Sequence, residues 1–196
     1  IFFIWTWFSA APYTPLPMAS LAKILTELGA QPGQVLVDLG AGDGRVLIQA
    51  SCDYGLRGVG YELHPLVWFV GKLRILLSGH NSNIKFRLAN LFEADLSKAD
   101  FVFLNILPHG SRRLINKFNA ELKPGAQVIS FGVHLDGLQY LRTIDLANQG
   151  VIGKMFPEQA YLYKTSNPLY PPCQGDSSAP LTRGEGGFPV SLDIFK

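Results

Sequence analysis

Residues 35–45 constrain the fold of this chain more than any other segment. They read Val-Leu-Val-Asp-Leu-Gly-Ala-Gly-Asp-Gly-Arg, an apolar run that ends in an acid and is followed by glycines at alternate positions. Residues 46–50 then have the apolar spacing of a helix. A strand, a glycine turn and a helix in this order form the first unit of a nucleotide-binding α/β sheet, because glycines let the backbone pass close to a ligand.

The spacing of the glycines indicates which ligand the turn binds. A dinucleotide fingerprint has its third glycine three places after the second, where this chain has Arg45. The chain reads G-x-G-x-G instead, and Asp38 precedes the turn. An acid at this place suits a ligand with an ammonium group and no phosphate, and S-adenosylmethionine is such a ligand. A nicotinamide-dependent enzyme is therefore a weak alternative.

On these residues the chain resembles class I S-adenosylmethionine-dependent methyltransferases. A second short strand, residues 58–62, ends in Glu62, about 20 residues after the first glycine. Residues 12–15, 18–28, 38–45 and 60–65 further resemble the small membrane-tethered protein-lysine methyltransferases that modify the ATP synthase c subunit and mitochondrial carriers, and their bacterial relatives. The similarity extends over about residues 11–165.

The resemblance implies a cofactor site at the entry segment, the glycine turn and the ends of the second and third strands. Asp38 is expected to face the cofactor's amino group, directly or through water, and Glu62 to accept hydrogen bonds from the ribose hydroxyls. Asn90 is expected near the adenine amino group, with Asp95 as the alternative. The expected cofactor-binding residues are Tyr13, Thr14, Asp38, Gly40, Ala41, Gly42, Gly44, Glu62, Asn90 and Leu91.

Three polar residues close to this set in the sequence are not assigned to cofactor binding. Asp43 is expected to cap the helix at residues 44–53. Arg45 is interpreted as a surface or sheet-edge residue, with a contact to the methionine carboxylate as the alternative. His64, beside a proline in a helix-entry turn, is interpreted as a surface residue without a catalytic role.

The residue expected to act on the substrate follows the fourth strand. Reacting groups of open α/β sheets lie beyond the carboxyl ends of the strands, and Asn105 ends the run Phe-Leu-Asn there. Asn105 is therefore expected to face the transferred methyl group as the catalytic residue. Many amino-methylating enzymes have Asn-Pro-Pro-aromatic at this place, whereas residues 105–108 read Asn-Ile-Leu-Pro. His109 is a weaker candidate for a base, and no metal ion is expected.

Composition narrows the function classes. The net charge of +2, from 17 basic and 15 acidic residues, does not indicate a nucleic-acid partner. Cys52 and Cys173 form neither a disulfide framework nor a metal set, and Cys52 is expected to be a buried, reduced thiol. We expect a monomeric methyltransferase acting on a protein lysine. The alternatives are a small-molecule or nucleic-acid acceptor, and a non-catalytic module that keeps the cofactor fold.

Periodicity predicts a Rossmann-like, doubly wound and mainly parallel seven-stranded sheet in residues 11–165, closed by an antiparallel hairpin. The hairpin is expected from residues 152–156 and 160–163, and residues 138–147 are ambiguous between helix and strand. The other predicted elements are helices 18–28, 44–53, 65–77 and one through Leu114, Phe118 and Leu122, and strands 34–39, 58–62, 84–88, 101–104 and 128–131.

The two ends of the chain differ from this domain. Residues 1–10 form an apolar stub in which residues 1–8 are uncharged and include two tryptophans, as at the interfacial end of a membrane helix. Eight residues are too few to cross a bilayer, and an arm packed on the domain is the alternative. We expect a cytoplasmic location, with anchoring at the cytoplasmic face of a membrane as an option. Residues 166–196, rich in Pro and Gly, are expected to be disordered.

Overall fold

The computed structural model describes residues 18–105, 111–146 and 159–165. The apolar stub, the entry segment with Tyr13 and Thr14, and the tail after Thr165 lie outside these ranges. The described elements are α2 (Met18–Glu27), β1 (Val35–Leu39), α3 (Arg45–Tyr54), β2 (Arg57–Glu62), α4 (Pro65–Leu77), β3 (Ile84–Leu88), the 3-10 turn η1 (Leu91–Glu93), β4 (Phe101–Leu104), α5 (Ser111–Glu121), β5 (Gln127–Phe131), β6 (Gln139–Asp145) and β7 (Gln159–Lys164).

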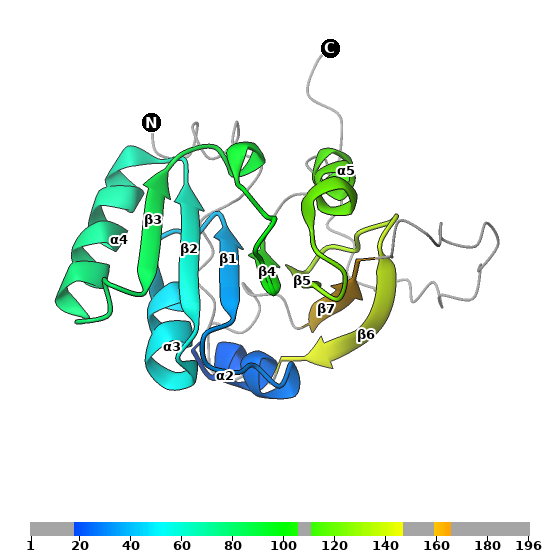
Figure 1. Cartoon of the computed structure of the whole chain (residues 1–196), viewed down its shortest axis with the longest axis horizontal. Coiled ribbons are helices and arrows are strands. Elements are labelled where there is room, and N and C mark those ends of the chain that lie inside the picture. The colour runs from blue at the N-terminus through cyan, green and yellow to red at the C-terminus, as the bar shows by residue number, and fades with distance from the viewer. Residues whose placement is uncertain (1–17, 106–110, 147–158, 166–196) are drawn as a thin grey trace, which may run out of the picture.

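The strands form one seven-stranded sheet in the order β3-β2-β1-β4-β5-β7-β6 (Figure 1). The first five strands in this order are parallel to one another, whereas β7 runs antiparallel to both β5 and β6. This topology confirms the predicted Rossmann-like sheet with antiparallel strands at its C-terminal edge. The predicted helices and strands before residue 132 agree with the observed ones to within one or two residues.

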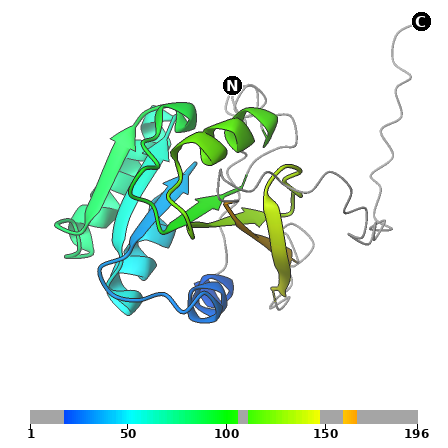
Figure 2. The same cartoon turned by 45° about the vertical axis from the view of Figure 1, so that its right-hand side comes forward.

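Two apolar clusters cover the two faces of the sheet. One joins α2, α3 and α4 to the sheet through residues such as Leu25, Leu47 and Ile75. The other buries Leu114 and Phe118 of α5 on the opposite face. Figures 1 and 2 show α5 separated from α3 and α4 by the strands. Both faces are therefore covered, as an internal parallel sheet requires.

The antiparallel hairpin is built from different residues than the sequence suggested. We expected residues 152–156 to pair with 160–163, but β7 is flanked by β5 on one side and by β6 on the other. The ambiguous segment 138–147 is therefore the strand β6, and residues 152–156 lie outside the described ranges. Most of β6 is exposed at the edge of the sheet, so it lacks the apolar alternation that identifies a half-buried strand.

Two further findings concern single features of the fold. The expectation that Cys52 is buried is wrong, because this thiol is exposed. The buried positions of α3 are Leu47, Ala50 and Ser51, and the helical repeat turns the next residue outward.

Among the described residues, the helices are all too short or too polar to cross a membrane.

Candidate cofactor site

The candidate site lies at the carboxyl end of β1, where the strand order reverses. β1 is flanked by β2 on one side and by β4 on the other, and Asp38 is aligned with Gly60 and Phe103. β3 and β2 extend the sheet in one direction from this point, and β4 and β5 extend it in the other. Such a topological switch point opens a crevice outside the strand ends, where open α/β proteins bind their ligands.

The glycine turn after β1 has a backbone that side chains would disturb. Gly40, Gly42 and Gly44 have φ angles of 94°, 55° and 74°, in the left-handed region that favours glycine. The amides of Gly40 and Ala41 donate hydrogen bonds to the carbonyl oxygen of Tyr61, at 2.9 and 3.0 Å. These bonds hold the turn against the end of β2. As a result Asp38, expected to bind the amino group of the cofactor, lies near Glu62, expected to bind its ribose.

Glu62 occupies the centre of this arrangement. Its Oε2 accepts a hydrogen bond from the amide of Gly42 at 2.9 Å, and its Oε1 accepts one from the amide of His64 at 2.7 Å. The carboxylate therefore links the glycine turn to the start of α4 in one fixed orientation. Each carboxylate oxygen can accept a second hydrogen bond, so both remain able to receive a ribose hydroxyl.

Asp38 is a buried acid with no compensating partner in the described part of the chain. The residue is only 7% exposed, and its carboxyl accepts no hydrogen bond from the residues that the structure describes. Burial, followed by the charges of Glu62 and Asp43, raises the pKa of Asp38 from 3.8 to about 7. An ammonium group next to this carboxyl would favour its ionised form. The environment of Asp38 thus fits the amino group of S-adenosylmethionine.

Asp43 contacts the start of α3 but is not its N-cap residue, so the expected cap is confirmed only in part. The N-cap residue is Gly44, and Asp43 Oδ1 accepts a hydrogen bond from the amide of Arg45, the first residue of the helix, at 3.4 Å. The Asp43 carboxylate also forms ion pairs with Arg45, at 2.6 Å, and with Arg74 of α4. Burial alone would raise the pKa of Asp43, but the hydrogen bonds and charges of these arginines lower it below its ordinary value. Arg45 is therefore partly buried and held by Asp43.

His64 also has a structural role. It is half-buried, and its Nδ1 accepts a hydrogen bond from the amide of Val67 at the start of α4. This capping interaction, rather than solvent exposure alone, accounts for a histidine before Pro65. This capping role could have been predicted from the sequence, because helices commonly begin with a polar N-cap residue followed by a proline at the first helical position.

The adenine end of the site follows β3. The amide of Ala89 donates a hydrogen bond to the carbonyl of Glu62 at 3.0 Å, so the ends of β2 and β3 lie side by side. Asn90 caps the turn η1, where its Oδ1 accepts a hydrogen bond from the amide of Phe92, and Leu91 is the first residue of that turn. Asp95 is exposed, and its carboxylate is bound to Ser97, which lowers its pKa. Both side chains thus make local hydrogen bonds, and the adenine contact through Asn90, with Asp95 as the alternative, stays a prediction.

The expected catalytic residue directly follows β4. Asn105 is partly buried at the carboxyl end of that strand, beside the switch point. Residues 106–110, which include His109, lie outside the described ranges, as do Tyr13 and Thr14. The described part of the chain therefore brings together Asp38, the glycine turn and Glu62. Asn90 and Leu91 follow the adjacent strand.

An aromatic cluster near the carboxyl end of β5 was not anticipated. The Nδ1 atom of His134 lies 2.9 Å from the Tyr163 hydroxyl oxygen. The centroid of the His134 ring lies 3.9 Å from that of the Tyr161 ring, and the two ring planes are inclined by 37°. Tyr163 also accepts a hydrogen bond from the amide of Leu135, and burial raises its pKa to about 12. The cluster depends on pairing between β5 and β7, so no local spacing in the sequence indicates it.

Comparison with known proteins agrees with this geometry. Residues 38–142 match the model of the ANTKMT methyltransferase domain. The Xenopus laevis lysine N-methyltransferase that is named for the ATP synthase c subunit is 32% identical over 120 residues, 61% of this chain and 52% of that protein. The chain thus spans about half the length of this curated relative.

Similar proteins of known structure have been solved with S-adenosylhomocysteine bound. An RNA methyltransferase from Salinibacter ruber, in complex with S-adenosylhomocysteine, is 30% identical, with a TM-score of 0.69 over 79% of this chain and 95% of that one. A methyltransferase from Thiobacillus denitrificans with the same ligand shares the fold, with a TM-score of 0.56 at 22% identity over 66% of this chain and 54% of that one. Because the family match covers more than half of the residues, the chain belongs to the ANTKMT methyltransferase family.

Proposed function

We propose that this enzyme transfers the methyl group of S-adenosylmethionine to a lysine side chain of a protein. The observation that carries the proposal is the 32% identity with a protein named as a lysine N-methyltransferase, over a segment of 120 residues. Membership of the family does not specify the methyl acceptor, because methyltransferases of one fold act on many acceptors. The proposal adds that the acceptor is a lysine.

The cofactor supplies a methyl group on a sulfonium, which is activated for displacement, so the protein chiefly has to position the two reactants. In our proposal Glu62 holds the ribose and Asp38 holds the amino group. These two contacts fix the cofactor relative to the end of β4. Asn105 then lies beside the acceptor, where its side-chain oxygen can receive a hydrogen bond from the amine.

An amine acceptor reacts only when it is unprotonated. Loss of water around the lysine lowers its pKa, and a hydrogen-bond acceptor such as Asn105 then orients the neutral amine without a dedicated base. No residue of the described site needs to form a covalent bond to the substrate. The proposal therefore assigns the chain the tasks of desolvation and alignment.

The second candidate acceptor is RNA. It is favoured by one observation, the 30% identity with an RNA methyltransferase from Salinibacter ruber of which this chain covers 95%. The nearly balanced charge of +2 argues against it, since nucleic-acid-binding proteins usually carry a basic surface. We therefore rank the protein acceptor first and expect no nucleic-acid partner.

The cellular setting is also a proposal. The uncharged residues 1–8, with two tryptophans, suit a position at the membrane interface. We propose a monomer on the cytoplasmic face of a membrane, with the site close to substrates that project from the bilayer.

Incubation with S-adenosylmethionine carrying a labelled methyl group tests the acceptor. Separated membrane-protein, soluble-protein, RNA and metabolite fractions serve as substrates, and Asn105→Ala serves as the matched control. Label in protein that appears as methyl-lysine after hydrolysis would support the proposal. Label only in RNA would establish the second candidate, and label only in metabolites would contradict both.

A further inference from the structure

Helix α4 presents an unusually apolar face to solvent. Its sequence, Pro-Leu-Val-Trp-Phe-Val-Gly-Lys-Leu-Arg-Ile-Leu-Leu, contains no acidic residue. Only Gly71 and Ile75 are fully buried against the sheet. Six large apolar side chains are between 48% and 77% exposed, namely Leu66, Phe69, Val70, Leu73, Leu76 and Leu77. Scattered exposed leucines are ordinary, but a continuous set on one element marks an interaction surface.

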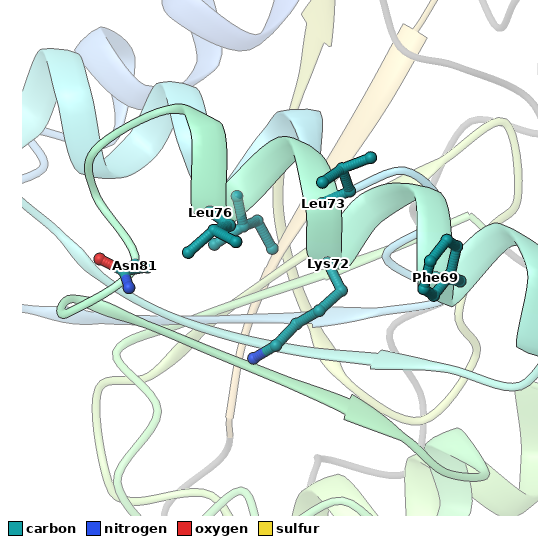
Figure 3. Close-up of a pocket in the computed structure, with 6 residues that line it drawn as sticks. Phe69, Lys72, Leu73, Leu76 and Asn81 are labelled. Carbon is teal, nitrogen blue, oxygen red and sulfur yellow. The ribbon is translucent and has the colours of Figure 1, made fainter.

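The helical repeat gathers these six side chains into one stripe. At about 100° per residue they occupy a continuous arc of about 120° on the side of α4 opposite Gly71. Lys72 borders the stripe on one side and Arg74 on the other. We define this apolar stripe with its two basic borders as the α4 face. A shallow pocket opens on it, lined by Phe69, Lys72, Leu73, Ile75, Leu76 and Asn81 (Figure 3).

The basic borders differ in their present contacts. Arg74 pairs with Asp43, although its side chain is still 47% exposed. Lys72 forms no ion pair with any residue that the structure describes. Figure 3 shows the Lys72 side chain extending away from the helix. The α4 face therefore combines exposed apolar area with positive charge that an external partner can neutralise.

We propose that the α4 face is a surface on which the protein docks to an anionic lipid bilayer. A helix with an apolar stripe bordered by cations lies in the plane of the membrane interface, with its apolar side chains among the acyl chains and its cations at the headgroups. At about 1.5 Å per residue, the 13 residues of α4 extend for about 20 Å, too short to span the bilayer.

A second copy of the chain suits this surface less well. Any two-fold pairing of α4 with itself places one basic border against another, because Lys72 and Arg74 occupy both sides of the stripe. The helix itself supplies no acid, and although Asp43 pairs with Arg74, Lys72 has no ion-pair partner among the described residues. Phospholipid headgroups provide the missing negative charge. Docking of the bilayer on the α4 face requires only α4 and does not depend on the identity of the methyl acceptor.

Docking through α4 would also place the active site near the membrane. The helix begins at Pro65, three residues after Glu62, so Leu66, the first residue of the apolar stripe, lies close to the cofactor site in the chain. The strands β1 to β3 point toward that same end of the molecule (Figure 1).

Vesicle binding by the full chain tests the proposal. The probes are vesicles of phosphatidylcholine alone and vesicles mixed with phosphatidylserine, and the readout is the protein fraction that co-sediments. The test variant is Phe69→Ser with Leu73→Ser, which removes two exposed apolar side chains. The matched control is Leu141→Ser, because Leu141 is 41% exposed on β6, at the opposite edge of the sheet from α4.

We expect the full chain to bind the mixed vesicles, and the double variant to bind them at least about tenfold more weakly. Leu141→Ser should bind like the unmodified chain. Lys72→Gln should bind more weakly to the mixed vesicles and unchanged to phosphatidylcholine. An unchanged affinity for S-adenosylhomocysteine in every variant would show that the fold is intact.

Three results would overturn the proposal. Equal binding by the double variant and Leu141→Ser would mean that another segment, such as residues 1–8, contacts the lipid. Absence of vesicle binding by the unmodified chain would exclude a lipid surface. A dimer in solution that Phe69→Ser with Leu73→Ser dissociates, without vesicle binding, would assign the α4 face to a second copy. None of these results depends on whether lysine is the acceptor.

Discussion

Replacement of Asp38 by Asn should stabilise the folded protein without ligand while weakening its affinity for the cofactor. Asp38 is buried without a partner among the described residues, and its pKa is raised to about 7 from an ordinary value of 3.8. The folded chain therefore retains a proton that the unfolded chain loses between about pH 4 and pH 7. Stability consequently falls as the pH rises through this window, because the unfolded state binds fewer protons there.

The expected size follows from the two pKa values. They differ by about three pH units, and each unit is worth about 1.4 kcal/mol, so the ionised carboxylate costs the folded state about 4 kcal/mol above pH 7. An Asn side chain has nearly the same shape and no charge. The difference in unfolding free energy between Asp38→Asn and the unmodified protein should therefore grow by up to about this amount from pH 4 to pH 8.

Urea unfolding at several pH values measures the difference, and any pH-independent effect of the amide cancels between them. Calorimetry with S-adenosylhomocysteine gives the second readout. Binding should weaken by about tenfold to a hundredfold in the variant, as for loss of a charged hydrogen bond. Binding to the unmodified protein near pH 6 should release protons, because the ligand's ammonium group keeps Asp38 ionised. A stability difference that is flat across the pH range, or equal affinity of both proteins, would refute this account of Asp38.

Three other substitutions test separate parts of the site. Glu62→Ala should raise the dissociation constant of S-adenosylhomocysteine about tenfold to a hundredfold by calorimetry, and unchanged affinity would place the ribose contact elsewhere. Gly44→Ala should lower the unfolding free energy by more than the αL cost of about 1–2 kcal/mol, because a Cβ would lie 3.0 Å from Ile75 Cδ1. Gly79→Ala is its control, with a φ of 77° and open space, and equal losses would contradict the packing argument. Asn105→Ala should lower kcat more than cofactor affinity, and a loss confined to binding would remove its assigned role.

The sequence predicted the parts of the fold that depend on local patterns. The parallel strands and their helices have strong apolar periodicity. The G-x-G-x-G spacing between a strand and a helix is typical of a small number of ligand-binding turns. Asp38 and Glu62 could be found because the chain must place an acid at the end of each of two adjacent strands. The structure adds that Glu62 accepts hydrogen bonds from the amides of Gly42 and His64, of which the first depends on contact between two separate segments of the chain.

The errors arise where long-range contacts decide the outcome. β6 is a strand because it pairs with β7, although its own side chains are mostly exposed. Asp43 was expected to cap α3 and does contact its first amide, but its carboxylate also pairs with Arg74, far along the chain. Cys52 was expected to be buried from the general behaviour of cysteine, whereas the phase of α3 turns it toward solvent. Tertiary contacts thus decided the outcome for β6 and Asp43, and the phase of the helix decided it for Cys52.

A crystal structure of this chain with S-adenosylhomocysteine tests the central claim most directly. The account predicts that the Glu62 carboxylate oxygens lie about 2.5–2.7 Å from the ribose hydroxyl oxygens, the distance typical of a hydroxyl donating to a carboxylate. It also predicts that Asp38 contacts the amino group directly or through one water molecule, while the glycine turn keeps its positive φ angles. Ribose hydroxyls bound by another residue, or an amino group directed away from Asp38, would contradict it.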